Sequence, residues 1–244
     1  MRPELNLAHV RHRLAVPFRI ARGERIVADV VTANVRSGAL TGRGESLPYP
    51  RYGESVESVI AQAAGLSEAV ANGLDRRALR DLLPPGAARN AIDCALWDLE
   101  AQRRGRSVAA LLGQPEVLPS LISAQTVALD SPERMARAAG ALAHLDLVKV
   151  KVDAADPAAQ IRAVRGALPS ARLIVDPNES WDFALLRALQ PVLTEARVEL
   201  VEQPLPAGSD EALEGFQSSV RLCADESCHV TADLPRLRGR SQVV

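Results

Sequence analysis

The feature that most constrains the fold of this chain is a regular alternation of short apolar runs with helical patterns, which begins after Gly113. A strand–helix unit of about 25 residues is typical of a parallel sheet, either doubly wound or closed into a barrel. The sequence has no Gly-x-Gly-x-x-Gly or Walker loop, so the nucleotide-binding versions of such a sheet lose their usual support. The predicted strands are residues 121–129, 145–152, 172–176, 198–202, 220–225 and the start of another at 241–244.

The first hundred residues follow a different pattern. The segment 26–35 and the run through Gly-Arg-Gly-Glu at 42–45 are typical of strands joined by a turn. From Ser55 onward the apolar residues recur at helical spacing, and a second helix is predicted over residues 87–102. Strands followed by helices predict an α+β domain in front of the α/β part of the chain.

Charge and composition exclude several classes of protein. The chain has 29 Lys and Arg residues against 30 Asp and Glu, so its formal net charge of −1 offers no field to hold nucleic acid or a membrane surface. No apolar stretch approaches the roughly 18 residues of a membrane span, and the N-terminal residues do not resemble a secretory signal. The three cysteines lack the spacing of a disulfide framework or a zinc site. We therefore expect a cytoplasmic protein without nucleic-acid or membrane partners.

Ionisable residues stand at the ends of four successive predicted strands: Lys149 with Lys151, then Asp176, Glu202 and Asp225. Because these positions are about one strand–helix unit apart, we expect them at the same height on neighbouring strands. In a parallel barrel that height is the carboxyl-end face, where active sites lie. One acid at a strand end more often caps a helix or faces solvent, but three in register favour a shared site.

Three carboxylates that converge repel one another and cannot all stay ionised alone. A hard divalent cation relieves that repulsion, and an all-oxygen site with room for water suits Mg²⁺. Lys149 and Lys151 point to the same face of their strand, where two close ammonium groups are expected to lower each other's pKa. Such a lysine can remove the proton α to a metal-bound carboxylate, and the metal stabilises the enolate. The residues predict racemisation, epimerisation or elimination through an enolised acid.

The strand ends carry four motifs: Lys149-Val-Lys151, Asp176-Pro-Asn-Glu-Ser-Trp181, Val201-Glu-Gln-Pro204 and Ala224-Asp-Glu-Ser227. With these motifs the chain resembles the enolase superfamily, in its muconate-lactonising subgroup. The N-terminal part carries four more: Pro17-Phe-Arg-Ile-Ala-Arg-Gly23, Gly42-Arg-Gly-Glu45, Arg51-Tyr-Gly-Glu-Ser55 and Ala95-Leu-Trp-Asp98. In these the chain resembles, more narrowly, the bacterial dipeptide epimerases that act on L-Ala-D/L-Glu.

The resemblance implies a role for each strand-end residue. Lys151 corresponds to the catalytic base that removes the α-proton of the substrate, and Lys149 to its partner, which holds the substrate carboxylate. The carboxylates that correspond to the Mg²⁺ ligands are Asp176, Glu202 and Asp225.

Residues away from the metal are also implied by the resemblance. Thr126, at the end of the first barrel strand, corresponds to a substrate-contacting threonine. Arg22 lies in the N-terminal loop that closes over the site in this family and is expected to meet the glutamate side chain, with Arg25 as an equal candidate. Asn178 and Glu226 would lie behind the metal ligands or satisfy loop backbone.

The resemblance also implies the architecture: an α+β capping domain with the substrate-closing loop, residues 1–115, and a TIM-like (β/α) barrel of the enolase type, residues 116–244. A complete barrel needs roughly 200 residues or more, so only about the first five to six strands are expected. The family's second lysine, at the end of the sixth strand, is expected just beyond Val244. The chain thus resembles a C-terminally truncated member.

The implied function is Mg²⁺-dependent epimerisation of L-Ala-D-Glu to and from L-Ala-L-Glu, in the recycling of murein peptides. The expected partner is a small-molecule dipeptide, and a homo-oligomer is left open. Two alternatives remain. One is a related enzyme on the same scaffold, a muconate cycloisomerase or an o-succinylbenzoate synthase. The other is an inactive truncated fragment that binds metal without turnover.

Overall fold

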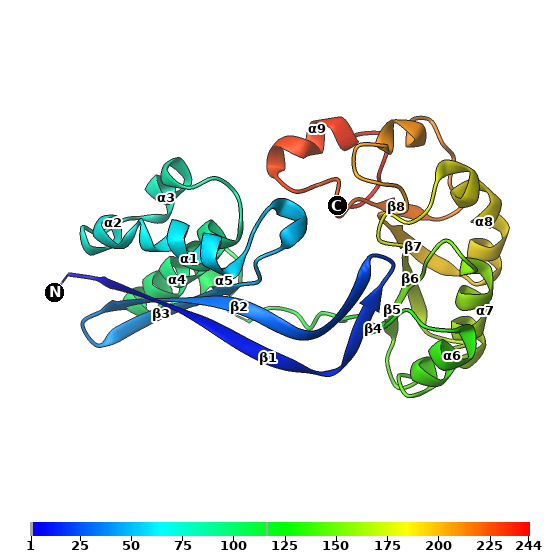
Figure 1. The fold of residues 1–244 in the computed structure, drawn as a ribbon, viewed down its shortest axis with the longest axis horizontal. Coiled ribbons are helices and arrows are strands. Elements are labelled where there is room, and N and C mark those ends of the chain that lie inside the picture. Colours follow the sequence, from blue (N-terminus) through cyan, green and yellow to red (C-terminus); the bar gives the residue numbers. More distant parts are fainter. Residues whose placement is uncertain (1, 116) are drawn as a thin grey trace. The chain divides into compact units, whose positions relative to one another are not determined.

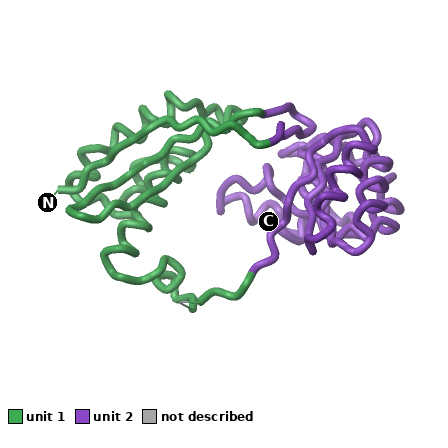
Figure 2. Tube along the Cα trace, turned by 90° about the horizontal axis from the view of Figure 1, so that it is seen from below, with its two compact units in different colours: residues 1–15, 26–120 green, residues 16–25, 121–244 purple. Residues whose placement is uncertain are grey.

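The computed structural model describes residues 2–115 and 117–244, which divide into two compact units. Unit 1 comprises Met1–Ala15 and Ile26–Ser120, and unit 2 comprises Val16–Arg25 and Leu121–Val244 (Figure 2). The tip of the first β-hairpin, residues 16–25, therefore belongs to unit 2. The domain boundary predicted between residues 115 and 116 falls on Glu116, which lies outside the described residues, and it stays a prediction.

Unit 1 combines a three-stranded sheet with helices, as predicted for the first part of the chain. In the sheet, β2 lies between β1 and β3, and β2 pairs antiparallel with β3 through a tight turn at residues 38–39. The strands are β1 (Glu4–Ile20), β2 (Gly23–Ser37) and β3 (Leu40–Ser46). The helices are the 3-10 helix η1 (Pro50–Tyr52) and the α-helices α1 (Val56–Ala64), α2 (Ser67–Ala71), α3 (Arg76–Leu82), α4 (Ala87–Arg104) and α5 (Val108–Leu111).

Unit 2 contains a five-stranded parallel sheet in which the strands follow their order in the chain. Figure 1 shows α6, α7 and α8 along one face of this sheet. The strands are β4 (Gln125–Val127), β5 (Leu147–Lys151), β6 (Arg172–Asp176), β7 (Val198–Glu202) and β8 (Arg221–Cys223). The helices are α6 (Pro132–Gly140), α7 (Pro157–Ala167), α8 (Phe183–Glu195), the 3-10 helices η2 (Asp210–Leu213) and η3 (Thr231–Asp233), and α9 (Leu234–Leu237).

The predicted strand–helix alternation is thus confirmed. An isolated parallel bridge between Cys223 and Val243 marks the beginning of a sixth strand, as predicted for the end of the chain. Each unit has its own hydrophobic core. The core of unit 2 contains Trp181, which is 1% exposed and whose Nε1 donates a hydrogen bond to the Asp153 carbonyl at 2.9 Å.

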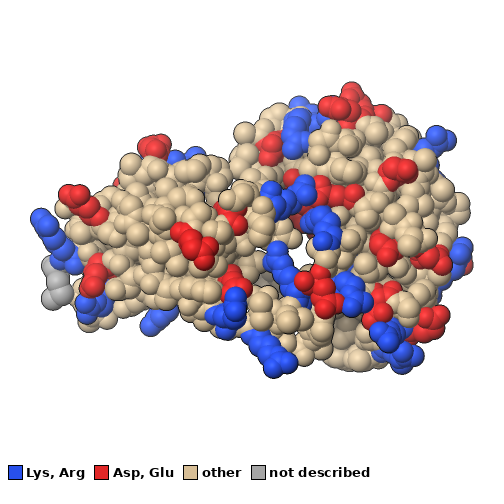
Figure 3. Space-filling view, in the orientation of Figure 1, with Lys and Arg blue, Asp and Glu red and all other residues tan. Residues whose placement is uncertain are grey.

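Two further observations bear on the predicted partners. Figure 3 shows basic and acidic side chains interspersed over the visible face, in keeping with the net charge of −1. Among the described residues, none of the helices is both long enough and apolar enough to span a membrane.

The Gly-x-Gly pair at 42 and 44 allows helix α4 to lie directly on strand β3. A Cβ atom built on Gly44 would be 2.0 Å from the Ala91 carbonyl oxygen, and one on Gly42 would be 2.0 Å from the Ala95 carbonyl oxygen. Both obstacles are backbone atoms of α4, so a side chain at either glycine requires the helix to shift. The close contact explains why glycine occupies alternate positions of β3, on the face that meets the helix.

Gly44→Ala is expected to lower the free energy of unfolding by about 1–3 kcal/mol or more, because the added methyl group overpacks a backbone contact. Urea unfolding followed by circular dichroism measures the change. Gly166→Ala is the matched control, because Gly166 lies inside α7 and has no atom within 4 Å of a built Cβ. That control should be neutral or stabilising by up to about 1 kcal/mol. Equal stability of the two variants would show that α4 can move away from β3 at little cost.

Candidate active site

The carboxyl ends of the parallel strands bring two lysines and two acids into one cluster. Lys151, the last residue of β5, pairs in register with Asp176, the last residue of β6. The Lys151 Nζ lies 2.5 Å from Asp176 Oδ2, and the Lys149 Nζ lies 2.9 Å from the same oxygen. Lys149 also reaches the Glu202 carboxylate of β7 at 2.7 Å. The Lys149 ammonium group therefore bridges acids from two neighbouring strands, and the Lys151 ammonium group pairs with one of them.

These two residues are the only lysines in the chain, since the other 27 of its 29 basic residues are arginines. The amine of lysine can lose its proton when its surroundings favour the neutral form, whereas the guanidinium of arginine stays charged. Both lysines of the chain therefore lie in this cluster.

The cluster is buried and its charges are strongly coupled. Asp176 is 0% exposed and Lys151 is 6% exposed. Burial by itself lowers the pKa of Lys149, but the carboxylates of Asp176 and Glu202 outweigh burial, and its pKa is raised overall. We predicted a lowered pKa from the neighbouring ammonium group. For Lys149 that prediction is wrong, because the Asp176 and Glu202 carboxylates lie within ion-pair distance of its ammonium group and raise its pKa.

The two other predicted acids hold their protons more tightly than usual. Burial raises the pKa of Glu202, and the nearby Asp176 carboxylate raises it further. Asp225, two residues beyond β8, keeps an exposed surface, but partial desolvation and the Glu226 carboxylate raise its pKa. In both groups burial is the largest cause of the raised pKa, and a neighbouring carboxylate acts in the same direction.

The carboxylates of Asp176, Glu202 and Asp225 are chemically suited to a divalent metal ion, although the Lys149 ammonium group lies between the first two. In the described part of the chain, no group of three or more His, Cys, Asp and Glu side chains is arranged to hold a metal ion. The Lys149 ammonium instead contacts both Asp176 and Glu202. Asp176, Glu202 and Asp225 nevertheless bring carboxylate oxygens to the ends of three neighbouring strands. An all-oxygen donor set of this kind suits Mg²⁺.

Thr126 and the hairpin tip are also placed near the cluster. Thr126 of β4 pairs in register with Lys149. The Phe18 ring, in the hairpin tip, has its centroid 5.9 Å from the Lys151 Nζ. Arg22 contacts the loop after β6, where its Nη1 donates to the Asn178 carbonyl at 2.8 Å.

Arg22 is held by acids of the chain itself. Its Nη1 lies 2.6 Å from Glu179 Oε2, and its Nη2 lies 2.5 Å from Glu226 Oε1. Its predicted contact with a substrate side chain is not tested by this arrangement and stays a prediction, as do the roles predicted for the other site residues.

Sequence reasoning missed Gln203, which fixes the loop that carries Asp225. The Gln203 Oε1 accepts hydrogen bonds from the backbone N–H groups of Asp225 and Ser227, both at 2.9 Å. Its Nε2 donates to the Leu205 carbonyl and to the Ser227 Oγ. Gln203 also has a positive φ of 37° directly after Glu202. A polar residue immediately after a strand-end acid was the available signal.

The loop after β6 is strained in a similar way. Asn178 and Glu179 both have left-handed backbones, with φ of 47° and 70°. Asparagine tolerates this region, but glutamate seldom adopts it, and such strain is concentrated at functional sites. In this conformation the Glu179 carboxylate accepts a hydrogen bond from Arg22 in the hairpin tip and another from the Ala207 backbone N–H, the latter at 2.7 Å.

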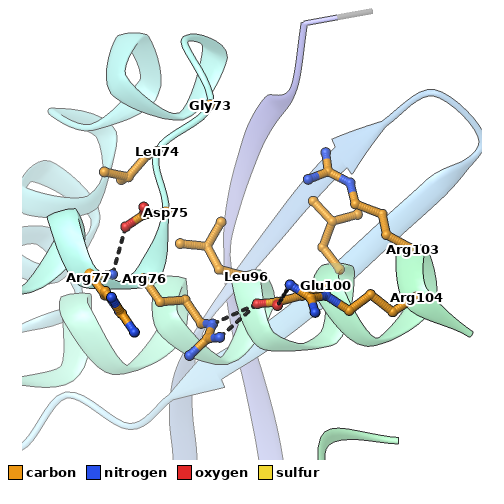
Figure 4. Close-up of a pocket in the computed structure, with 10 residues that line it drawn as sticks. Gly73, Leu74, Asp75, Arg76, Arg77, Leu96, Glu100, Arg103 and Arg104 are labelled. Carbon is orange, nitrogen blue, oxygen red and sulfur yellow. Dashed lines mark hydrogen bonds and ion pairs between the residues drawn. The ribbon is translucent and has the colours of Figure 1, made fainter. Parts of the chain in front are cut away.

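A separate cavity of about 540 Å³ lies in unit 1, between the turn before α3 and one side of α4 (Figure 4). Its arginines are partly neutralised within the wall, because Glu100 pairs with both Arg76 and Arg104. Arg76 also stacks on the Trp97 ring, with its guanidinium carbon 3.2 Å from the ring centroid. The wall contains none of the predicted site residues, and its ion pairs serve the packing of α3 on α4.

Comparison with known proteins gives consistent matches over both units. The N-terminal domain of mandelate racemase / muconate lactonizing enzyme matches residues 2–113, and the enolase C-terminal domain-like family matches residues 132–243. The L-Ala-D/L-Glu epimerase of Escherichia coli (strain K12) is 46% identical over 235 residues, which cover 95% of this chain and 72% of that protein.

Two solved structures share the fold. One is an enolase family member from Agrobacterium tumefaciens with homology to dipeptide epimerases, with bound sodium and L-Ala-L-Glu. It is 44% identical, with a TM-score of 0.95 over 99% of this chain and 74% of that one. The other is a dipeptide epimerase from Enterococcus faecalis complexed with Mg and L-Leu-L-Tyr. It is 26% identical, with a TM-score of 0.89 over 100% of this chain and 74% of that one. The predicted enolase-type fold is confirmed by these matches.

Proposed function

The chain belongs to the enolase superfamily, with the two domains of its mandelate racemase / muconate lactonizing enzyme branch, and on that premise we propose that it interconverts L-Ala-D-Glu and L-Ala-L-Glu. The E. coli epimerase, at 46% identity, supports dipeptide epimerisation as the reaction class. The observation that carries the proposal is the cluster of Lys149, Lys151, Asp176 and Glu202 at neighbouring strand ends. It joins acids suited to a metal with amines suited to proton transfer.

Asp176, Glu202 and Asp225 would hold a Mg²⁺ ion, which supplies positive charge to stabilise the oxygens of an enolised substrate carboxylate. Lys151 would take the proton from the glutamate α-carbon, and Lys149 would bind the substrate carboxylate. The Lys151 ammonium group lies 2.5 Å from the Asp176 carboxylate, which places the proposed base directly beside a proposed metal ligand.

Thr126 and the hairpin tip would complete the substrate pocket. Thr126 lies beside Lys149 on the next strand and offers a hydroxyl for hydrogen bonding. Phe18 places an apolar ring near Lys151, where exclusion of water strengthens electrostatic interactions. With L-Ala-D/L-Glu as the proposed substrate, we further propose a part in murein-peptide recycling in the cytoplasm.

A proton NMR time course with L-Ala-L-Glu and Mg²⁺ in D₂O tests the proposal. We expect the glutamate α-proton signal to decrease, because Lys151 exchanges it with solvent, and the L-Ala-D-Glu diastereomer to appear if a proton can also be delivered to the opposite face. A parallel sample with EDTA should retain the signal. Loss of the α-proton without the diastereomer would limit the activity to enolisation. No exchange in a sample that binds Mg²⁺ would instead favour the inactive metal-binding alternative.

A further inference from the structure

Asp225 differs from the two other proposed metal ligands in what holds its backbone. Asp176 and Glu202 are the last residues of β6 and β7, so the sheet itself places them. Asp225 lies beyond the end of β8 at Cys223, outside the strand. Its backbone N–H donates instead to the Gln203 Oε1 at 2.9 Å. The position of the Asp225 carboxylate therefore depends in part on what holds the Gln203 side chain.

A chain of hydrogen bonds leads from Gln203 to a buried ion pair. The Gln203 Nε2 donates to the Ser227 Oγ at 2.9 Å, and this hydroxyl donates to the Asp210 Oδ1 at 2.8 Å. The Asp210 Oδ2 accepts from the Arg236 Nη1 at 3.1 Å. Gln203, Ser227 and Asp210 are all buried. We call the four residues of this chain the polar network: Gln203, Ser227, Asp210 and Arg236.

The carboxylate of Asp210 fixes the direction of these hydrogen bonds. An ionised carboxylate only accepts, so the single proton of the Ser227 hydroxyl points to Asp210. The Ser227 oxygen is then left as an acceptor, and it requires the NH₂ group of Gln203 on its side. The Leu205 carbonyl, 2.8 Å from the same nitrogen, requires the same orientation. The carbonyl oxygen of Gln203 is thereby directed at the backbone N–H groups of Asp225 and Ser227.

Arg236 supplies the charge that Asp210 needs inside the protein. The Asp210 side chain is 3% exposed, and a carboxylate at that depth is costly unless a cation and hydrogen-bond donors satisfy it. Arg236, on α9, is 41% exposed and reaches Asp210 from the surface. Its Nη2 also donates to the Ser227 carbonyl. One guanidinium group thus ties η2, which contains Asp210, to the loop that carries Asp225.

We propose that Asp210 and Arg236 are positioning residues for the metal site: through Ser227 and Gln203 they hold the backbone of Asp225 in place and so strengthen the binding of Mg²⁺. The inference rests on the proposed function, because it takes Asp225 as a metal ligand. Groups that orient a metal ligand typically contribute ten- to a hundredfold to metal affinity. A network that only stabilised the fold would leave the affinity of the folded chain unchanged.

Isothermal titration calorimetry of the full chain with Mg²⁺ measures this contribution. Arg236→Gln should raise the Kd for Mg²⁺ by about ten- to a hundredfold, because Asp210 loses its cation and the Ser227 carbonyl loses a donor. Arg240→Gln is the matched control, because Arg240 follows α9 but pairs with the exposed carboxylate of Glu214. Its Kd should equal that of the parent. An unchanged Kd in Arg236→Gln, or an equal rise in Arg240→Gln, would overturn the proposal.

Ser227→Ala tests the same network without changing any charge. It removes the hydroxyl that joins Asp210 to Gln203, so the Kd for Mg²⁺ should again rise by about ten- to a hundredfold. Ser46→Ala is its control, because it removes a buried hydroxyl that donates to the Ala87 carbonyl in unit 1. That variant should bind Mg²⁺ like the parent. A rise of the same size in Ser46→Ala would show that any lost buried hydrogen bond has this effect, and would contradict the assigned role.

Amide hydrogen exchange measured by NMR without Mg²⁺ tests the positioning directly. The Asp225 amide should exchange faster in Arg236→Gln and in Ser227→Ala, because its acceptor is no longer fixed. The Val152 amide, which donates to the Asp176 carbonyl, should exchange as in the parent. Unchanged exchange at Asp225 would overturn the inference.

The two readouts also separate this inference from the proposed function. A parent chain that binds Mg²⁺, with variants that bind it equally well, would overturn the role of the polar network and leave the proposed epimerisation standing. A parent chain that bound no Mg²⁺ would contradict the proposed function itself, and this inference with it.

Discussion

Lys151→Arg is expected to slow exchange of the glutamate α-proton of L-Ala-L-Glu by about 10²–10⁴-fold, the usual contribution of general acid–base catalysis. Arginine keeps a cation beside Asp176, so the ion pair at this buried position is retained. Its guanidinium does not lose a proton at accessible pH, so it cannot act as a base. The variant therefore separates proton transfer from charge pairing.

The rate is measured by the loss of the α-proton signal in D₂O at a fixed Mg²⁺ concentration. Arg162→Lys is the control for the opposite substitution, from arginine to lysine. Arg162 of α7 forms an exposed ion pair with Glu195 of α8, away from the proposed site. That variant should exchange at the rate of the parent chain. If Lys151→Arg exchanged as fast as the parent, the base would have to be another residue, and Lys149 is the only other lysine in the chain.

Residue order predicted the chemistry of the site because parallel topology converts sequence spacing into spatial proximity. Lys151 and Asp176 are placed side by side by the register of β5 and β6, with no need for side-chain detail. The register of β4 and β5 likewise places Thr126, which the family resemblance alone had implied, beside Lys149. A strand that ends one strand–helix unit later brings its last residue to the same edge of the sheet.

Contacts that depend on loop conformation could not be predicted in this way. The ion pairs of Arg22 with Glu179 and Glu226 accompany left-handed backbone at Asn178 and Glu179, and nothing in the local sequence specifies which loop a buried glutamate will face. Strand β4 covers only Gln125–Val127 and is shorter than the strand predicted over residues 121–129. Leu121 and Ile122 lie before it and are exposed at 86% and 55%. Apolar composition predicts burial on average, but the chain leaves these two side chains outside the sheet.

Asp176→Asn is expected to lower the free energy of unfolding by about 3–5 kcal/mol, the cost of breaking a buried ion pair from one side. Asparagine preserves the size of the side chain but leaves the Lys149 and Lys151 ammonium groups with less negative charge nearby. Relief of repulsion between Asp176 and Glu202 acts in the opposite direction. The attraction should win, because Asp176 is 0% exposed and touches two cations at 2.5 and 2.9 Å.

The pH dependence of the stability lost in Asp176→Asn follows from the raised pKa of Lys149. Its pKa is raised in the folded chain, so its contribution to stability is complete below the ordinary value of 10.5 and disappears only as pH rises through the raised pKa. The difference between the parent and Asp176→Asn should therefore hold across neutral pH and up to about pH 10, where Lys149 is still charged in both the folded and the unfolded chain. Urea unfolding at pH 7 and pH 9 measures it.

Glu199→Gln supplies the matched control, because Glu199 of the same sheet also bridges two cations, Arg172 and Arg221. Both of these arginines are at least half exposed, so the control should cost no more than about 1 kcal/mol. We expect Mg²⁺ to raise the unfolding temperature of both the parent and Glu199→Gln, and to fail to do so for Asp176→Asn. A small loss in both variants, with Mg²⁺ stabilisation intact, would mean that Asp176 neither anchors the lysines nor binds the metal.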